Sequence, residues 1–225
     1  MAFQPAFVDG RAFTSAVGKV VCVGRNYAAH ARELGNETPA SPLLFIKPST
    51  SVVPMKERIR VPRHLGQVHF ETEVALLIGA PLVGVAPEEA LAGIAGIGLA
   101  LDLTLRDVQA ELKAKGHPWE RAKGFDGACP LSDFVPFSMA SSPSSRMDPD
   151  DLHFTLAIDG ECRQRGHTAM MLFDCAALLA EISRTFSLEP GDVVLTGTPE
   201  GVGALPEGAR LALALAGNFE IVTRS

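Results

Sequence analysis

The chain has 225 residues, of which 47% are hydrophobic and 20% are charged, a balance typical of a globular protein and not of a disordered one. Its length suits one large domain or two small ones. The formal net charge of −6, without any run of Lys or Arg, disfavours a nucleic-acid-binding surface or an anionic-membrane-binding surface.

Short apolar runs predict strands along most of the chain. Many of these runs are separated by Gly or Pro turn signals, such as Asp159-Gly160 and Pro190-Gly191. The expected strands cover residues 19–23, 43–46, 71–78, 97–105, 152–158, 192–196, 211–215 and 220–222.

Helical patterns are few by comparison. Each one is bounded by a residue type that commonly begins or ends a helix. The expected helices are 27–34, capped by Asn26 and ended by Gly35; 106–115, with Asp107 in its first turn; and 168–185, with Thr168 as N-cap.

The predominance of strands with scattered helices favours an α+β fold built on a mixed β-sandwich or barrel. Regular alternation of strands and helices is missing, which disfavours a doubly wound parallel sheet. The Ser- and Pro-rich stretch 141–151 is the most linker-like part of the chain. We interpret it as a surface loop within a single domain spanning 1–225, because the strands on each side are too few to form separate cores.

Three carboxylates are the most informative candidates for a functional site. Glu71 and Glu73 alternate in an expected strand, so both side chains project to one face. Asp102 lies in another apolar run, where burial is costly unless the carboxylate pairs or binds a cation. If the two strands are neighbours, the three acids form an oxygen-only metal site.

A solvated acidic face is the alternative for this pair of glutamates, although the apolar run 74–78 favours a buried strand. His69 falls on the same face of the expected strand. As a fourth ligand it would shift the preference toward Mn, Fe or Zn. We prefer to interpret it as a residue that supports the ligands or packs beside them.

His30 and Glu33 are three residues apart on one face of the expected helix 27–34. A carboxylate beside an imidazole raises its basicity and fixes its tautomer, so the pair could take a proton from water. The alternative is a solvated helical pair. Gly24 and Gly35 bracket the segment and would allow residues of about 25–36 to move as a lid.

Lys123 lies in a Gly-rich stretch that would ordinarily be an exposed loop. Placed over a metal-bound substrate, it would stabilise developing negative charge. Gln109 follows Asp102 on the next expected helix, where it would orient a substrate oxygen or face water. The Gly-rich loop 195–203 lacks the Lys-Ser/Thr ending of a phosphate-binding loop, so nucleotide binding is disfavoured.

The cellular compartment of the protein can be predicted from its cysteines and its apolar segments. The four cysteines are widely spaced without a C-x-x-C pair, which favours a reduced protein over a disulfide scaffold or zinc ribbon. The first twenty residues lack the basic start and apolar block of a signal peptide. The longest apolar segment is interrupted by charges, unlike a membrane span. We expect a cytoplasmic protein.

Several short motifs, in their order along the chain, resemble those of the fumarylacetoacetate hydrolase family. Each is modest alone, but the ordered set is specific and spans about residues 19–222. The matching stretches are Val23-Gly24-Arg25-Asn26-Tyr27, His30-Ala31-Arg32-Glu33, Phe45-Ile46-Lys47-Pro48, Glu71-Thr72-Glu73, Asp102, Arg106-Asp107-Val108-Gln109, Lys123-Gly124-Phe125-Asp126 and Thr196-Gly197-Thr198-Pro199-Glu200-Gly201-Val202-Gly203.

This resemblance implies the mixed β-sandwich or roll of the family's C-terminal domain, with peripheral helices, in a form that is usually a homodimer. It is most similar to the small acylpyruvase and oxaloacetate decarboxylase branch. The implied site has Mg²⁺ or Mn²⁺ held by the three carboxylates and a 2-oxo acid as substrate. The implied catalytic residues are His30, Glu33 and Lys123, and the implied substrate-binding residues are Arg25, Gln109 and Thr198.

Two positions depart from the family's usual pattern. The family often has Asp at the position of His69 and Asn at the position of His167. The first departure concerns the surroundings of the metal, and the second bears on substrate choice. His64, His117 and His153 match no motif and are interpreted as surface or packing residues.

The expected activity is metal-dependent hydrolysis of the C–C bond of acylpyruvates such as acetylpyruvate or fumarylpyruvate. Oxaloacetate decarboxylation passes through the same enolate and would need little change. The first alternative is an isomerase, hydratase or decarboxylase of 2-oxo-dienoic acids; the lid pair favours hydrolysis over it. The second is a non-enzymatic β-sandwich module that binds structural Ca²⁺.

Overall fold

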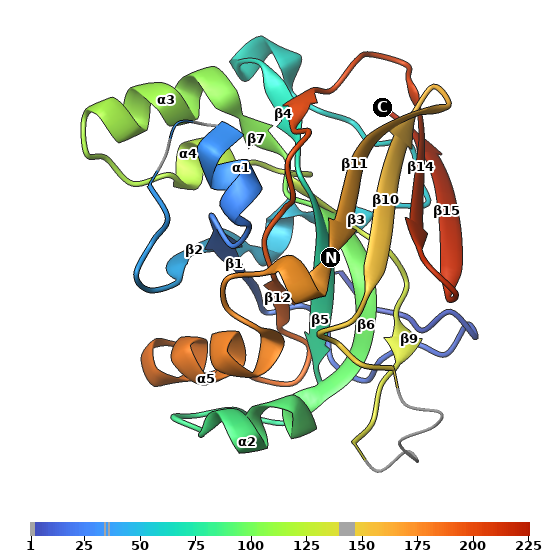
Figure 1. The fold of residues 1–225 in the computed structure, drawn as a ribbon. Coiled ribbons are helices and arrows are strands. Elements are labelled where there is room, and N and C mark those ends of the chain that lie inside the picture. The colour runs from blue at the N-terminus through green and yellow to red at the C-terminus, as the bar shows by residue number, and fades with distance from the viewer. Residues whose placement is uncertain (1–2, 34, 36, 140–146) are drawn as a thin grey trace.

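The computed structural model describes residues 3–33, 35, 37–139 and 147–225, and its described strands form three sheets (Figure 1). The largest sheet has the strand order β2-β1-β12-β5-β6-β8-β3, with β9 paired to β6. Its strands are β1 Lys19–Gly24, β2 Leu43–Pro48, β3 Val52–Pro54, β5 Thr72–Ile78, β6 Ile94–Leu101, β8 Cys129–Leu131, β9 Val135–Pro136 and β12 Val193–Leu195.

A four-stranded sheet, in the order β11-β10-β14-β15, packs across β5 and β6 (Figure 1). Its strands are β10 His153–Ile158, β11 Glu161–His167, β14 Arg210–Leu215 and β15 Phe219–Arg224. A third, small sheet has the order β13-β4-β7. Its strands are β4 Val68–Phe70, β7 Thr104–Leu105 and β13 Gly203–Ala204.

The helices lie outside the sheets, with α1, α3 and α4 grouped at one side and α2 beside α5 at another (Figure 1). None of the described helices is long and apolar enough to cross a membrane. The α-helices are α1 Ala28–Glu33, α2 Pro87–Ala90, α3 Arg106–Ala114, α4 Glu120–Lys123 and α5 Cys175–Thr185. Single 3₁₀ turns cover Ser49–Ser51, Arg63–Leu65, Leu91–Gly93 and Thr168–Met170.

Both faces of the large sheet are buried, which explains the nearly continuous apolar runs of its central strands. On one face of β5, Val74 and Leu76 pack in the main core with Leu213 of the four-stranded sheet. On the other face, Ala75 and Leu77 belong to a second apolar cluster closed by aromatic residues of the N-terminal segment. The structure confirms the predicted α+β sandwich architecture. The single-domain organisation and the homodimer stay predictions.

Two of the three acidic residues lie where the chain passes from one sheet to another. Glu71 lies between β4 and β5, and Asp102 lies between β6 and β7. The strands pair as β4 with β7 and β5 with β6, so the two crossings lie side by side. The Asp102 N–H donates to the Glu71 carbonyl at 2.8 Å. The expected continuous strand 97–105 is therefore wrong, because the ladder is interrupted at Asp102.

The expected helix 168–185 is also wrong in its first third. A 3₁₀ turn covers Thr168–Met170, and α5 begins only at Cys175, with the Asp174 side chain accepting from the Ala177 N–H at 2.7 Å. Residues between them lie outside any helix and are tied to Asn26, whose carbonyl accepts the Leu172 N–H. The sequence patterns also missed β3, β4, β8, β9, β11 and β13. Residues 141–146 of the expected surface loop lie outside the described residues.

Candidate active site

One pocket gathers most of the predicted site residues, at the side of the large sheet covered by α1, α3 and α4. Short loops after β1, β4, β6 and β12 converge on it with these helices. Its lining consists of Val23, Gly24, Arg25, His30, Leu43, Phe45, Glu71, Glu73, Asp102, Arg106, Gln109, Lys113, Trp119, Lys123 and Thr198.

The three carboxylates converge inside this pocket. One oxygen each from Glu71, Glu73 and Asp102 lies within 4.8 Å of the other two, although the residues are only 5%, 2% and 1% exposed. The β5–β6 pairing that the metal prediction required is present. Like charges this close and this buried repel strongly, so the arrangement persists only with cations beside it.

Lys123 supplies one such cation. Its Nζ donates to Glu71 Oε2 at 2.9 Å and to Asp102 Oδ2 at 2.6 Å. The residue is 3% exposed at the end of helix α4, so the expected exposed Gly-rich loop is wrong. Burial lowers the pKa of Lys123, but Asp102 and Glu71 outweigh that effect and the pKa lies above its usual range. Lys123 is therefore a permanent positive charge between two of the acids.

Lys47 and Arg106 neutralise the same two acids from other directions. Lys47, fully buried at the end of β2, places Nζ 2.7 Å from Asp102 Oδ1 and donates to the Leu103 carbonyl at 3.3 Å. It also donates to the Lys123 carbonyl. Arg106 forms an ion pair with Glu71. Burial raises the pKa of Glu71, but Lys123 and Arg106 outweigh it, so the pKa lies well below its ordinary value.

Glu73 is the acid without a cation. Among the described residues, no basic side chain forms an ion pair with it. The one hydrogen bond found to its side chain there is from the Gly197 N–H to Oε2, at 2.6 Å. Burial, followed by the charges of Asp102 and Glu71, raises the pKa of Glu73 well above its ordinary value. Within the part of the chain that the structure describes, the negative charge of the cluster is therefore left without a cationic partner at Glu73.

These features fit a hard divalent cation. Mg²⁺ binds oxygen ligands at about 2.1 Å, so its ligand atoms lie no more than about 4.2 Å apart, and small side-chain adjustments would suffice here. Glu73 has no cationic partner, and Asp102 Oδ1, although near Lys47, has no hydrogen-bond partner among the described residues. Glu71, Glu73 and Asp102 would hold the ion. An all-oxygen set suits Mg²⁺ and Mn²⁺ alike.

The second predicted pair, His30 and Glu33, lies on α1. His30 is 4% exposed and lines the pocket, with its Nδ1 3.4 Å from Glu33 Oε2. Glu33 also accepts the Gly201 N–H, at 3.1 and 3.2 Å to its two oxygens. The Gly-rich loop after β12 thus holds Glu33 toward His30. Lid movement stays a prediction, and residues 34 and 36 of the expected lid lie outside the described residues.

The three expected substrate-binding residues have different surroundings. Arg25 has a positive φ of 60°, a conformation uncommon outside glycine and frequent at functional sites. Gln109 on α3 accepts from Arg106 at 2.7 Å. Thr198 donates to the Thr72 carbonyl at 2.9 Å, directly between the two glutamates in sequence. The structure brings all three to the same pocket.

Comparison with known proteins identifies the family of this chain. The family described as Fumarylacetoacetate (FAA) hydrolase C-terminal matches residues 19–220. The chain belongs to this family. The resemblance of the sequence motifs is thereby confirmed, and the fumarylacetoacetate hydrolase fold accounts for the sandwich architecture.

Individual members of the fumarylacetoacetate hydrolase family are similar to nearly the whole of this chain. The Escherichia coli protein named oxaloacetate tautomerase YcgM is 47% identical over 202 residues, 90% of either chain. A family protein from Yersinia pestis superposes with a TM-score of 0.93 at 42% identity, over 99% of each chain. The fumarylpyruvate hydrolase of Pseudomonas aeruginosa, solved with Mn²⁺ and pyruvate, has a TM-score of 0.89 at 35% identity and covers 99% of this chain and 95% of its own.

His69, the first departure from the family pattern, is not part of the acidic cluster among the described residues. It lies on β4, with Nε2 3.2 Å from Gln67 Oε1. Burial and then the Arg106 charge lower the pKa of His69, which favours neutral imidazole. This supports the interpretation of His69 as a packing residue.

Three residues that matter here carried no role in the sequence interpretation. Lys47 and Arg106 appeared only within matched motifs. Gln164 was missed entirely, because its burial is not visible in the mostly polar sequence of β11. Its side chain accepts the Thr72 N–H at 2.9 Å and donates to Thr198 Oγ1 at 2.9 Å and to the Pro199 carbonyl at 3.0 Å.

Replacing Gln164 with Ala is expected to lower the free energy of unfolding by about 1 to 3 kcal/mol, because buried polar groups would lose their partners. Urea unfolding measures this change. Arg163→Ala, at an exposed neighbour on β11, is the matched control. Equal unfolding midpoints for the two variants would contradict the expected contribution of the Gln164 hydrogen bonds to stability.

Proposed function

We propose that this chain is a divalent-metal-dependent enzyme that interconverts the keto and enol forms of oxaloacetate. The proposal is supported chiefly by one observation: the acidic cluster and four basic side chains line the same small pocket. The basic residues are Arg25, Arg106, Lys113 and Lys123. The relation to a protein named oxaloacetate tautomerase supports the same substrate.

The charges of the pocket favour a dianionic ligand. Four basic and three acidic side chains leave one positive charge, which a divalent cation would raise to three. Oxaloacetate carries two carboxylates, whereas acetylpyruvate carries one. Arginine binds carboxylates in a bidentate manner, so Arg25 is the candidate for the end of the substrate remote from the cluster, whereas Arg106 pairs with Glu71.

Tautomerisation needs a proton to leave C3 and another to be added at the C2 oxygen, with no carbon–carbon bond broken. His30 is the group in the pocket best suited to hold and move that proton, and Glu33 orients its imidazole. Lys123 stabilises the negative charge that develops on the substrate. When bound, Mg²⁺ or Mn²⁺ supplies Lewis-acid polarisation of the 2-oxo acid.

Hydrolysis of acylpyruvates is the second candidate. It is favoured by the His30–Glu33 pair, which could equally take a proton from water, and by the likeness to a fumarylpyruvate hydrolase. Water would add to the distal carbonyl, and cleavage would leave the enolate of pyruvate. Fumarylpyruvate, a dicarboxylate, suits the charge of the pocket better than acetylpyruvate does.

One set of assays separates the two candidates. The enol form of oxaloacetate is added to the protein with Mg²⁺, with Mn²⁺ and with EDTA, and loss of enol absorbance is followed. Pyruvate release from fumarylpyruvate, acetylpyruvate and oxaloacetate is measured in parallel. We expect fast, EDTA-sensitive enol decay with little pyruvate release. Faster pyruvate release from an acylpyruvate would make hydrolysis the main activity, and inertness in every assay would overturn both candidates.

A further inference from the structure

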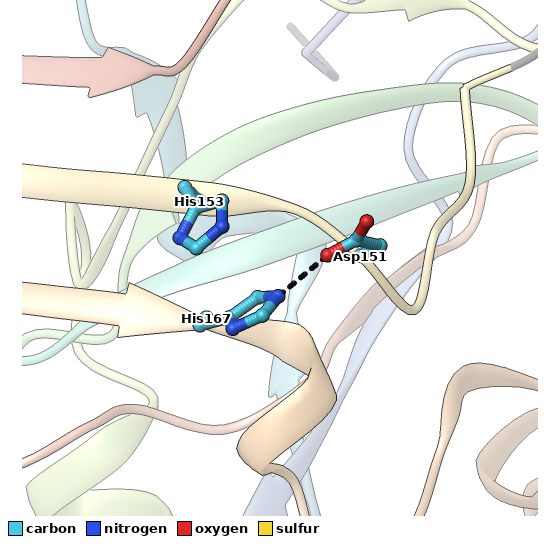
Figure 2. A group of neighbouring side chains, drawn as sticks. All are labelled: Asp151, His153 and His167. Atoms are coloured by element: carbon cyan, nitrogen blue, oxygen red, sulfur yellow. Dashed lines mark hydrogen bonds and ion pairs between the residues drawn. The ribbon is translucent and has the colours of Figure 1, made fainter.

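A second group of ligating side chains lies outside the active site. It consists of Asp151, His153 and His167 (Figure 2), and one ligand atom from each lies within 4.8 Å of the others. His167 Nε2 is 2.7 Å from Asp151 Oδ1. The His153 and His167 rings stack with centroids 3.9 Å apart and an angle of 22° between their planes.

The backbone fixes this group in place. His153 and His167 are directly opposite one another in the antiparallel β10–β11 pair, so their side chains share one face. The next residues outward, Thr168 and Leu152, are also hydrogen-bonded to each other. The Thr168 N–H donates to the Leu152 carbonyl at 3.0 Å, and Thr168 Oγ1 accepts the Leu152 N–H at 2.8 Å. Asp151 directly precedes Leu152 in the chain. The backbone positions of the three ligands are thus fixed, and binding one ion would require only that the stacked imidazole rings rotate to aim a nitrogen from each at it.

We propose that Asp151, His153 and His167 bind one Zn²⁺ ion, at a site separate from the acidic cluster. Zinc sites with an open position commonly have three protein ligands, such as imidazoles and a carboxylate, with water or an anion in the fourth position. Imidazole-containing sites prefer Zn²⁺ and its first-row neighbours, whereas carboxylate-only sites suit Mg²⁺ and Mn²⁺. The two groups of ligands therefore select different metals.

Access to the group is provided by its own pocket, which is distinct from the active site. His153 and His167 line it together with Ala28, Ala29 and Arg32 of α1. The same short helix presents His30 to the active site. The ion would therefore bind on the other side of α1 from the proposed catalytic pair, with Arg32 and Arg165 available to an anionic fourth ligand.

Zn²⁺ binding to tag-free, EDTA-stripped protein tests the proposal, with a chromophoric chelator as competitor. The Glu73→Gln variant serves as background, so that the acidic cluster contributes no strong site. We expect one Zn²⁺ per chain, with His153→Ala and His167→Ala each weakening binding by about tenfold or more. Co²⁺ absorption would report the imidazole ligands directly.

His117→Ala, an exposed histidine outside both groups, is the matched control and should bind Zn²⁺ like its parent. Thermal melting without metal checks that each variant is folded. Two results would overturn the proposal: loss of all Zn²⁺ binding in Glu73→Gln alone, or unchanged binding in the His153→Ala/His167→Ala double variant. Because the readout is metal binding, it is independent of whether the proposed tautomerase activity is found.

Discussion

Replacing Glu73 with Gln is expected to abolish metal-dependent turnover while making the metal-free protein more stable. Gln keeps the shape of Glu, and its Oε1 can still accept the Gly197 N–H. It removes, however, one of only three anionic ligands. Since changes that merely disturb a metal ligand typically cost 10–100-fold in affinity, loss of the ligand itself should weaken Mn²⁺ binding by about 100-fold or more.

The stability gain follows from the surroundings of Glu73. Burial, Asp102 and Glu71 raise its pKa above the ordinary value of 4.5. A carboxyl with a raised folded-state pKa lowers stability increasingly as pH rises above the unfolded-state pKa, because the unfolded state then loses its proton readily and the folded state does not. The gain from Gln should therefore be small near pH 4.5 and reach about 1 to 3 kcal/mol near neutral pH, the usual cost of an uncompensated buried polar group.

Thermal melts in EDTA at about pH 5 and pH 8 measure this difference, and Mn²⁺ titration measures the loss of affinity. Glu220→Gln, at an exposed position on β15, controls for the removal of one negative charge. A lower melting temperature than wild type at the higher pH would show that Glu73 is already compensated. Undiminished Mn²⁺ binding would remove Glu73 from the ligands.

The acidic cluster was the part of the site most accessible to sequence reasoning. Alternation along a strand places Glu71 and Glu73 together whatever the rest of the fold does. Asp102 needed a further condition, the pairing of β5 with β6, which depends on residues about thirty positions away. The break between sheets at Asp102 was not visible locally, because Leu101, Leu103 and Leu105 continue a regular alternation across it.

The basic residues of the site were harder to predict. The short sequence around Lys123 gives no sign of burial; the residue is buried because Glu71, Asp102 and Phe45 surround it. Lys47 likewise looks like the polar end of a strand until its contact with Asp102 is known. From the local sequence alone, a lysine is expected to be exposed because burying its charge is costly. The carboxylates that make its burial possible are brought to it only by the tertiary structure.

The incorrect helix prediction for residues 168–185 also arises from contacts that the local sequence does not reveal. Residues 168–185 have a helical apolar pattern, yet Asn26 accepts the Leu172 N–H through its carbonyl and the Phe173 N–H through its side chain. Its side-chain amide donates to Phe173 and Thr196 carbonyls. Asn26, the expected helix cap, instead cross-links this segment to the rest of the fold in a non-helical conformation, so tertiary contacts override the local helical preference.

Replacing His30 with Ala is expected to lower kcat by about 10²- to 10⁴-fold, the usual contribution of a general base, while metal binding persists. The imidazole lies in the pocket close enough to Glu71 to influence its pKa, but it forms no part of the acidic cluster. Steady-state kinetics with oxaloacetate and exchange of the C3 protons into deuterated water measure the loss of catalysis. Mn²⁺ titration measures metal binding.

The Glu33→Gln variant tests whether Glu33 takes part in catalysis or only positions His30. Gln can still accept the Gly201 N–H, but it no longer places a charge beside His30 Nδ1. If Glu33 only positions His30, this variant should cost less in kcat than His30→Ala does. His64→Ala, at an exposed histidine, controls for loss of an imidazole. Unchanged kcat and undiminished C3 exchange in His30→Ala would remove this pair from the chemistry and leave Lys123 as the one remaining predicted catalytic side chain.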